Sequence, residues 1–311
     1  MPSINNYDEM LRAAAAVGPV PVAIAAAHEH EVLFAASEAE ARGIITAVLV
    51  GNARAIEQMA REHGLNLQGM RIVDEPDDAA AADRAMQIVA RGDAKVAVKG
   101  QVQTPVFLRS ALRREAGLRT DRLISHVGVF EVPGFDRLLF ITDGGVVLFP
   151  TLEQKIEIVS NGIAVARGLG IAQPRVALLA AADEVFPEVP VTLEIAEIVA
   201  MQERWQAEGA VVGGPFLLDT AVSPEIARQR GRGGRVAGRA EVLVGPDVQS
   251  VNIMCKGITY FAGGRMAGLV VGARAPLVVG SRADPPKTRL VCIAAGALLA
   301  AGPHSQPQQS G

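Results

Sequence analysis

Aromatic residues and cysteines are scarce in this 311-residue sequence. Aromatics make up 4% of the chain and there are 2 cysteines, whereas hydrophobic residues reach 50%. Few aromatic rings leave few platforms for base stacking, which argues against binding single-stranded nucleic acid. Cys255 and Cys292 lie too far apart for a CxxC metal site. We expect two buried, reduced thiols in a cytoplasmic protein, and neither a disulfide framework nor a cysteine nucleophile.

A charge excess of either sign is missing as well, and so are long apolar runs. With 30 Lys and Arg against 33 Asp and Glu, the net charge is -3. This balance argues against bulk electrostatic binding to nucleic acid or to an anionic membrane. The apolar stretch 13–27 is interrupted by Pro19 and Pro21, and the stretch 291–302 is shorter than the roughly 20 residues of a membrane-spanning helix. We therefore expect no signal peptide and no membrane contact.

Short apolar runs alternate with amphipathic ones through the first 120 residues. Strands are predicted at 21–27, 44–50, 71–73 and 95–98, with helices at 31–42, 52–63, 77–91 and 104–116. Alternation of this kind is typical of parallel βαβ units. Runs that are apolar on both faces fit strands buried on both sides. At ~150 residues per domain, the length suggests about two domains.

The pattern changes after residue 122. Two strand-like runs, 123–132 and 137–142, flank Pro133-Gly134, which predicts a hairpin. Thr151 and Gln154 have the spacing of a capping box at the start of a helix. Later strands are expected at 175–181, 210–212, 241–244, 268–271 and 276–279, and helices at 192–208 and 223–230. We place a domain change near 145–151.

Polar groups follow several predicted strands, and in open α/β sheets ligands bind beyond the carboxyl ends of the strands. Five groups occupy such places: Lys99-Gly100 with Thr104 and Arg109, Ser125-His126, Thr142-Asp143-Gly144-Gly145, Asn252 with Lys256, and Ser281-Arg282-Ala283-Asp284. Each alone also fits a structural role, since Thr-Asp-Gly-Gly is an ordinary turn and Ser-Arg-Ala-Asp fits a cap before a solvated face. His28 and His30 bracket Glu29; without further partners at zinc spacing, we interpret them as polar surface residues at a helix start.

Taken in order, these blocks resemble the phosphate acetyl/butyryltransferase family, and its butyryl-type branch more closely than its acetyl-type branch. The resemblance covers residues 20–300. It rests on Lys99-Gly-x-x-x-Thr104-x-x-x-x-Arg109, Gly117–Thr120, Leu123–Val127, Arg137–Gly145, Leu152–Lys155, Gly214-Pro215 with Leu218–Ser223, Ala237-Gly238 before Val242–Val244, Asn252 with Lys256, and Gly272–Pro276 leading to Ser281–Asp284.

The resemblance implies an α/β fold of two α/β/α lobes, like isocitrate and isopropylmalate dehydrogenases, with the site in the cleft between the lobes. We assign residues 1–148 and 275–311 to the first lobe and 149–274 to the second. The implied protein is a homodimeric acyltransferase of class EC 2.3.1. It would move a short or branched acyl group between coenzyme A and phosphate, converting acyl-CoA plus phosphate to acyl phosphate plus CoA. CoA would be a substrate, and no cofactor or metal is expected.

The resemblance also implies residue roles. Arg282 would stabilise charge in the tetrahedral transition state, because a guanidinium can hold phosphate oxygens bidentately. Ser281 would hydrogen-bond the thioester or its sulfur. Asp284 is either a base for the thiol or a helix cap. The expected substrate-binding residues are Lys99, Thr104, Arg109, Ser125, His126, Thr142, Asp143, Gly144, Asn252 and Lys256.

Four positions, Val147, Phe186, Gly213 and Gln249, depart from the family pattern, and three of them replace polar residues by apolar or small ones. This favours either a bulkier, more apolar acyl pocket or a loss of catalysis. The second outcome would leave a homologue that binds CoA or acyl phosphate as a sensor or partner subunit. A third hypothesis, a metal-dependent hydroxy-acid dehydrogenase, rests on fold analogy alone, and the lack of an Asp cluster argues against it.

Overall fold

A computed structural model describes residues 3–281 and 284–302 of the chain. The chain divides into two compact units: a first unit of Tyr7–Arg122 with Ala267–Gly311, and a second unit of Met1–Asn6 with Leu123–Met266. The C-terminal segment thus belongs to the same unit as residues 7–122. Residues 123–148 fall within the second unit, whereas the sequence analysis grouped them with the first lobe. The lobe boundaries at 148 and 275 stay a prediction.

The first unit is a parallel sheet with helices on both faces. Its strands are β1 (Val20–Ala25), β2 (Ile45–Gly51), β3 (Arg71–Asp74), β4 (Val96–Lys99) and β11 (Leu277–Val278), with the later residues of β10 (Arg265–Val271). Its helices are α1 (Tyr7–Val17), α2 (His30–Ala41), α3 (Ala53–His63), α4 (Asp78–Ala90), α5 (Thr104–Leu112), the 3-10 helix η1 (Arg114–Ala116) and α12 (Pro286–Ala301). The strand order is β3-β2-β1-β4-β11-β10, and only β10 runs antiparallel to its neighbour β11.

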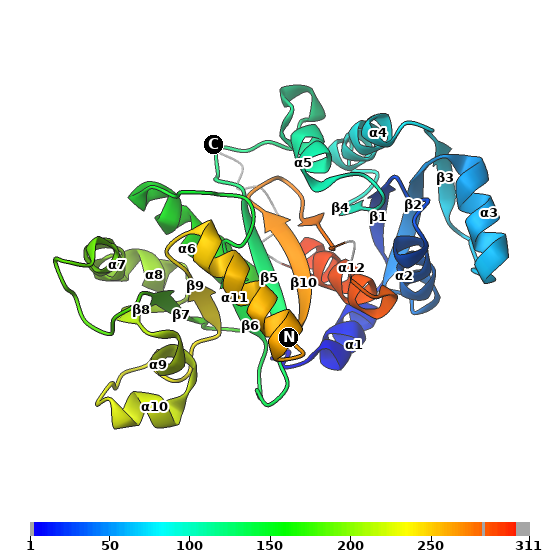
Figure 1. The fold of residues 1–311 in the computed structure, drawn as a ribbon. Coiled ribbons are helices and arrows are strands. Elements are labelled where there is room, and N and C mark those ends of the chain that lie inside the picture. Colours follow the sequence, from blue (N-terminus) through cyan, green and yellow to red (C-terminus); the bar gives the residue numbers. More distant parts are fainter. Residues whose placement is uncertain (1–2, 282–283, 303–311) are drawn as a thin grey trace. The chain divides into compact units, whose positions relative to one another are not determined.

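Local signals in the sequence explain these elements. The Asn52 side chain accepts a hydrogen bond from the amide of Ala55 and begins α3, while Gly64, at φ 64°, ends it. Helix α4 packs on β1, β2 and β4 and against α5, and α12 packs on β1, β4 and β11 and against α1 and α2. Figure 1 shows α4 and α5 on one side of these strands and α1, α2 and α12 on the other. The predicted parallel βαβ arrangement is therefore confirmed.

The second unit is also a sheet covered by helices. Its strands are β5 (Ser125–Glu131), β6 (Leu139–Thr142), β7 (Arg175–Leu179), β8 (Val211–Phe216) and β9 (Val242–Val244). Its helices are α6 (Leu152–Gly168), α7 (Pro190–Ala200), α8 (Gln202–Ala207), α9 (Leu218–Val222), α10 (Pro224–Gln229) and α11 (Val248–Phe261). The order is β5-β6-β9-β7-β8; β5 and β6 form the predicted antiparallel hairpin, and the other pairs are parallel.

Helices α6 and α11 cover opposite faces of this sheet. The predicted capping box at Thr151 and Gln154 is present at the start of α6. Gly162 of α6 lies against Val242, because a Cβ there would come 2.9 Å from the Val242 side chain. On the other face, Val251 and Cys255 of α11 join the buried cluster that includes Ile141 and Leu243. Side chains of consecutive strand residues point to opposite faces of a sheet. Val242 therefore faces α6, and Leu243 faces α11.

Three features of the second unit differ from the sequence prediction. The helix predicted over 192–208 is two helices, α7 and α8, interrupted at Met201. The indole nitrogen of Trp205 donates to the carbonyl of Ile198 at 2.7 Å, so a buried side chain bonds a carbonyl at the end of α7. Helices α9 and α11 were not predicted, and neither was α1 in the first unit. The apolar run 291–302 falls largely within α12, and no helix in the described part of the chain is long and apolar enough to cross a membrane.

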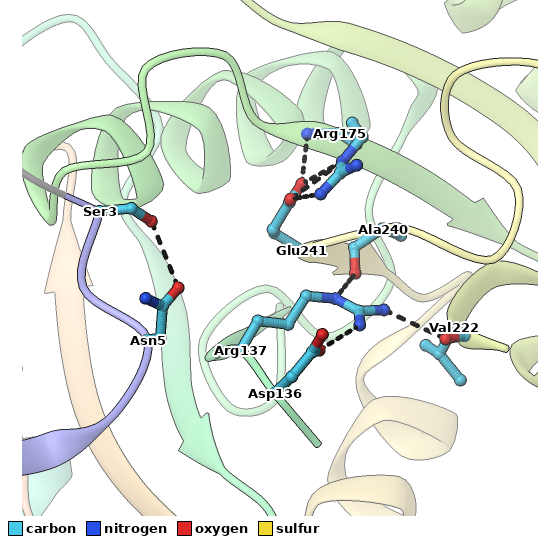
Figure 2. A network of polar contacts seen from close by, with 8 residues as sticks. All are labelled: Ser3, Asn5, Asp136, Arg137, Arg175, Val222, Ala240 and Glu241. Carbon is cyan, nitrogen blue, oxygen red and sulfur yellow. Dashed lines mark hydrogen bonds and ion pairs between the residues drawn. The ribbon is translucent and has the colours of Figure 1, made fainter. Parts of the chain in front are cut away.

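Charged contacts tie together the amino ends of the parallel strands in the second unit (Figure 2). Arg175, the first residue of β7, donates its Nε to Glu241 at 2.9 Å, and the Arg175 amide donates to the same carboxylate at 2.8 Å. Arg137, which precedes β6, donates to the carbonyls of Ala240 and Val222 at 3.2 and 3.1 Å. These contacts lie at the sheet edge opposite to the carboxyl ends, where the sequence places the polar loops.

Candidate functional site

The Thr142–Gly145 loop of the second unit folds around one carboxylate. Asp143 follows β6 and is 4% exposed. One carboxylate oxygen accepts from the amides of Gly145 and Val146 at 2.7 and 2.9 Å. The other accepts from the amides of Val147 and His126, both at 3.1 Å. Four backbone amides are therefore bonded to Asp143, and Asp143 acts as the organiser of the loop.

The hairpin brings Ser125 and His126 beside this loop. They stand at the start of β5 and not after a strand, but β5 is antiparallel to β6, and Val127 pairs with Thr142. The Thr142 hydroxyl donates to the carbonyl of His126 at 2.8 Å. The Ser125 hydroxyl accepts from the Asn161 amide at 2.8 Å. Ser125 and Thr142 are both fully buried. These contacts support a positioning role, and direct substrate contact by either residue stays a prediction.

Helix α11 supplies Asn252 and Lys256, which the sequence analysis placed at a strand end. This placement was wrong, because both residues lie within the helix. They are four positions apart, so they share one face, and both are exposed. The Asn252 side chain donates to the carbonyl of Gly144 at 3.0 Å. Asn252 thus lies beside the Thr142–Gly145 loop, but it reaches this loop from helix α11 and not from the end of a strand.

His126 and Cys255 lie next to Gly144. A Cβ at Gly144 would be 3.5 Å from Cys255 Sγ and 3.6 Å from His126 Nδ1. Burial lowers the pKa of His126, and the nearby Asp143 carboxylate opposes this effect. The Nδ1 atom of His126 is buried and has no hydrogen-bond partner within the described ranges 3–281 and 284–302. Burial raises the pKa of the Cys255 thiol to about 12. A thiol of this kind is protonated at neutral pH and is a poor nucleophile.

In the first unit, Lys99 and Gly100 follow β4. Lys99 is 2% exposed, and its ammonium donates to the carbonyls of Gly100 and Val102 at 3.0 and 3.1 Å. A Cβ at Gly100 would lie 2.3 Å from the carbonyl oxygen of Ala26, so only glycine allows the end of β4 to approach the end of β1 this closely. Lys99 therefore bonds its own loop, and the ligand role predicted for it stays untested.

Ser281 and Asp284, which follow β11 in the sequence, are hydrogen-bonded to each other. The Ser281 amide donates to the Asp284 carboxylate at 2.6 Å, and the Asp284 amide donates to the Ser281 carbonyl at 3.0 Å. Asp284 is not the helix cap considered from the sequence, because Pro285 occupies that position of α12. Arg282, the expected charge-stabilising residue, lies outside the described residues. Thr104 begins α5 and is partly buried, while Arg109 lies in its last turn and is exposed.

Sequence reasoning missed three residues near these loops. Glu29, which stands between the two histidines interpreted as surface residues, forms an ion pair with Arg289 of α12 at 3.1 Å. Arg289 and Asn161 are buried polar residues in largely apolar helices. A polar residue among apolar ones in the sequence could have identified both, because a buried polar group needs a partner. His28 contacts Asp78 at 3.2 Å, and His30 lies 3.7 Å from Glu31. Among the residues that the structure describes, no group of three His, Cys, Asp or Glu side chains is placed to hold a metal ion.

Each unit thus gathers polar loops at the carboxyl edge of its parallel strands. In the first unit the ends of β4 and β11 supply Lys99 and Ser281, and in the second unit β6 supplies Thr142 and Asp143. Ligands bind at such an edge in open α/β sheets. The fold and these loops define an α/β protein with candidate site loops at the carboxyl ends of its strands.

Comparisons with known proteins specify the family. Residues 80–297 match the family model described as Phosphate acetyl/butaryl transferase. The chain is 40% identical over 297 residues to phosphate butyryltransferase of Clostridium acetobutylicum, which covers 96% of this chain and 99% of that protein. It is 40% identical to phosphate acetyltransferase of Rhizobium meliloti, with 96% and 94% covered. The chain belongs to the phosphate acetyl/butaryl transferase family.

A solved structure supports the same conclusion. The branched-chain phosphotransacylase of Enterococcus faecalis V583 matches with a TM-score of 0.79 at 28% identity, over 90% of this chain and 99% of that chain. The predicted family, the α/β fold class and the enzyme class, an acyltransferase, are confirmed. The named relatives are enzymes, and they give no support to the sensor alternative.

Proposed function

We propose that the chain transfers a short or branched acyl group directly between coenzyme A and inorganic phosphate. The observation that carries this proposal is the hydrogen bonding between Ser281 and Asp284, which fixes a hydroxyl-bearing residue at the carboxyl edge of the first unit, immediately before Arg282 in the sequence. Relatives named for butyryl and branched-chain acyl groups support the choice of acyl class. Apolar or small residues at Val147, Phe186 and Gly213 support a more apolar acyl pocket.

The reaction balances without an acyl-enzyme intermediate. A phosphate oxygen attacks the thioester carbonyl carbon, the carbon–sulfur bond breaks, and the CoA sulfur leaves with the bonding electrons and takes up a proton. Burial raises the pKa of both cysteine thiols, Cys255 and Cys292, to about 12, which supports direct transfer and not a cysteine-bound acyl group. No atom changes its oxidation state, so CoA is proposed as a substrate and no resident redox cofactor is required.

Residue roles follow from this chemistry. Ser281 would hydrogen-bond the thioester or its sulfur, and Arg282 would offset the negative charge that develops at the carbonyl and phosphate oxygens. Asp284 holds the Ser281 backbone, and its second proposed role is to accept the thiol proton in the reverse direction. Of the other predicted substrate contacts, Lys99 lies at the end of β4, and Ser125, His126, Thr142, Asp143 and Gly144 lie in or beside the loop that Asp143 organises. Thr104 and Arg109 lie in α5, and Asn252 and Lys256 lie in α11. A cytoplasmic location stays a prediction.

The test is the release of free thiol from a panel of acetyl-, butyryl- and isobutyryl-CoA, with and without phosphate. We expect thiol release that depends on phosphate, with the four-carbon substrates favoured over acetyl-CoA in kcat/KM. Arsenate in place of phosphate serves as a control for attack by an oxyanion. If no member of the panel gives phosphate-dependent release, the proposed function is wrong. Calorimetric binding of CoA without turnover would instead favour the sensor.

We also infer a homodimer. Helix α11 exposes Ile253, Tyr260 and Phe261, and Phe261 is 93% exposed. Their spacing of seven and eight positions places them along one helix face. Exposed apolar groups gathered in this way mark an interaction surface. Light scattering during gel filtration should return the mass of two chains, and the mass of one chain at micromolar concentration would refute the inference.

A further inference from the structure

A buried ion pair lies at the carboxyl edge of the first unit. The Arg289 side chain is 3% exposed, and its Nη2 lies 3.1 Å from Oε1 of Glu29, whose side chain is 11% exposed. Glu29 follows the end of β1, and Arg289 stands near the start of α12, 260 residues later. Glu29 Oε2 and Arg289 Nε are buried and have no hydrogen-bond partner among the residues that the structure describes. The pair is therefore less than fully satisfied.

Arg289 also reaches the loops that follow β4 and β11. Its Nη1 is 3.5 Å from the carbonyl oxygen of Lys99. A Cβ at Gly280 would lie 2.7 Å from Arg289 Cδ and 3.0 Å from Nε. The backbone of Gly280 thus packs directly against the Arg289 side chain, and a larger residue at position 280 would have to displace that side chain. A single side chain therefore links the ends of three neighbouring strands, β1, β4 and β11.

The residue after Gly280 is Ser281, to which the proposed function gives the thioester contact. Its amide is bonded to the Asp284 carboxylate at 2.6 Å. Arg289 supports the backbone before Ser281, and Asp284 bonds Ser281 itself. The neighbouring loop after β4 is fixed separately, because the Lys99 ammonium bonds the carbonyls of Gly100 and Val102. The Arg289 side chain connects this loop to the Ser281 loop.

We propose that Arg289, paired with Glu29, is a positioning residue that holds the Ser281 loop against the Lys99 loop during acyl transfer. This inference rests on the proposed function. A buried ion pair pays a desolvation penalty, so it is weak evidence for stability, and fixing geometry is one of its attested uses. The positioning matters because transfer requires reacting atoms to be held within a fraction of an ångström.

The experiment compares kcat and KM of phosphate-dependent thiol release in four variants of the full chain. R289M removes the charge, R289K keeps the charge without the planar fork, and E29Q keeps the shape of Glu29 while removing its charge. R175M is the matched control. It breaks the Arg175–Glu241 ion pair, which lies at the amino ends of the parallel strands in the second unit (Figure 2). Thermal unfolding of each variant reports on stability.

We expect R289M and E29Q to lower kcat about 10- to 100-fold with KM changed less than about threefold, the scale for a site displaced by about 1 Å. R289K should fall between wild type and R289M. R175M should melt at a lower temperature and keep its kcat. If R289M does not fold, kcat and KM of E29Q and R289K are compared with those of wild type instead.

Two results would overturn the inference, and they are distinguishable. An active wild type whose R289M and E29Q variants lose melting temperature but keep kcat would show that the pair is only structural. In that case the R175M and R289M profiles would look alike. A wild type without phosphate-dependent thiol release would overturn the proposed function, and the positioning role would fall with it.

Discussion

Replacing Arg282 by alanine is expected to lower kcat for phosphate-dependent thiol release at least ~100-fold, the scale for removing one donor that stabilises a transition state. The physical reason is charge. Phosphate attack on a thioester brings negative oxygens together with a developing oxyanion, and a guanidinium can bond two of these oxygens at once. Arg282 follows Ser281, whose backbone is fixed by Asp284. The measurement is steady-state kinetics on the preferred acyl-CoA.

Two further variants make this prediction specific. Arg282→Lys keeps the positive charge without the planar fork, so its kcat should lie between those of wild type and Arg282→Ala. Arg61→Ala on α3 removes an arginine that is 71% exposed and 3.9 Å from Glu57, and its kcat should be unchanged. A kcat for Arg282→Ala equal to that of wild type would remove Arg282 from the mechanism.

Much of the fold was accessible from local sequence signals. The strands and helices of residues 20–116 alternate regularly, and caps such as Asn52, Asp77 and Thr151 stand next to their helices, so the signal and the structure it specifies are close in sequence. The hairpin of β5 and β6 follows from Pro-Gly between two apolar runs. In each case the deciding interaction spans only a few residues.

Helix α11 escaped prediction for a physical reason. Val251 and Cys255 are buried, but Ile253, Tyr260 and Phe261 on other positions of the same helix are exposed. Apolar residues on both faces blur the 3.6-residue period that identifies an amphipathic helix. The break between α7 and α8 was missed because neither glycine nor proline marks it.

The sequence allowed us to predict which residues lie at the candidate site, but not where their side chains point. The polar groups after β4, β6 and β11 were found because strand ends are where ligands bind in such sheets. Whether a side chain there faces a ligand or its own loop depends on backbone geometry, and Lys99 and Asp143 both bond their own loops. The Glu29–Arg289 pair joins residues 260 positions apart, and no local pattern could pair them.

Replacing Asp143 by asparagine is expected to lower the free energy of unfolding by roughly 2–4 kcal/mol, since bonds to a charged group contribute about 1.5–3 kcal/mol each. The carboxylate accepts four backbone amides, two on each oxygen. Asparagine keeps one carbonyl oxygen, and its NH₂ group cannot accept. Two of these amides would therefore lose their acceptor; water can replace part of the loss, because Gly145 is exposed and His126, Val146 and Val147 are half-buried. Urea unfolding measures this change.

Asp247→Asn is the matched control, because Asp247 also accepts a backbone amide, that of Ser250 at 2.9 Å, at the start of α11 in the same unit. Asparagine caps a helix about as well as aspartate, so its free energy of unfolding should stay within about 0.5 kcal/mol of wild type. If Asp143→Asn unfolds like Asp247→Asn, the carboxylate does not organise the loop. If it is destabilised and kcat falls while KM holds, the four amide bonds set the position of Thr142 and His126, which makes Asp143 a positioning residue and not a ligand for substrate.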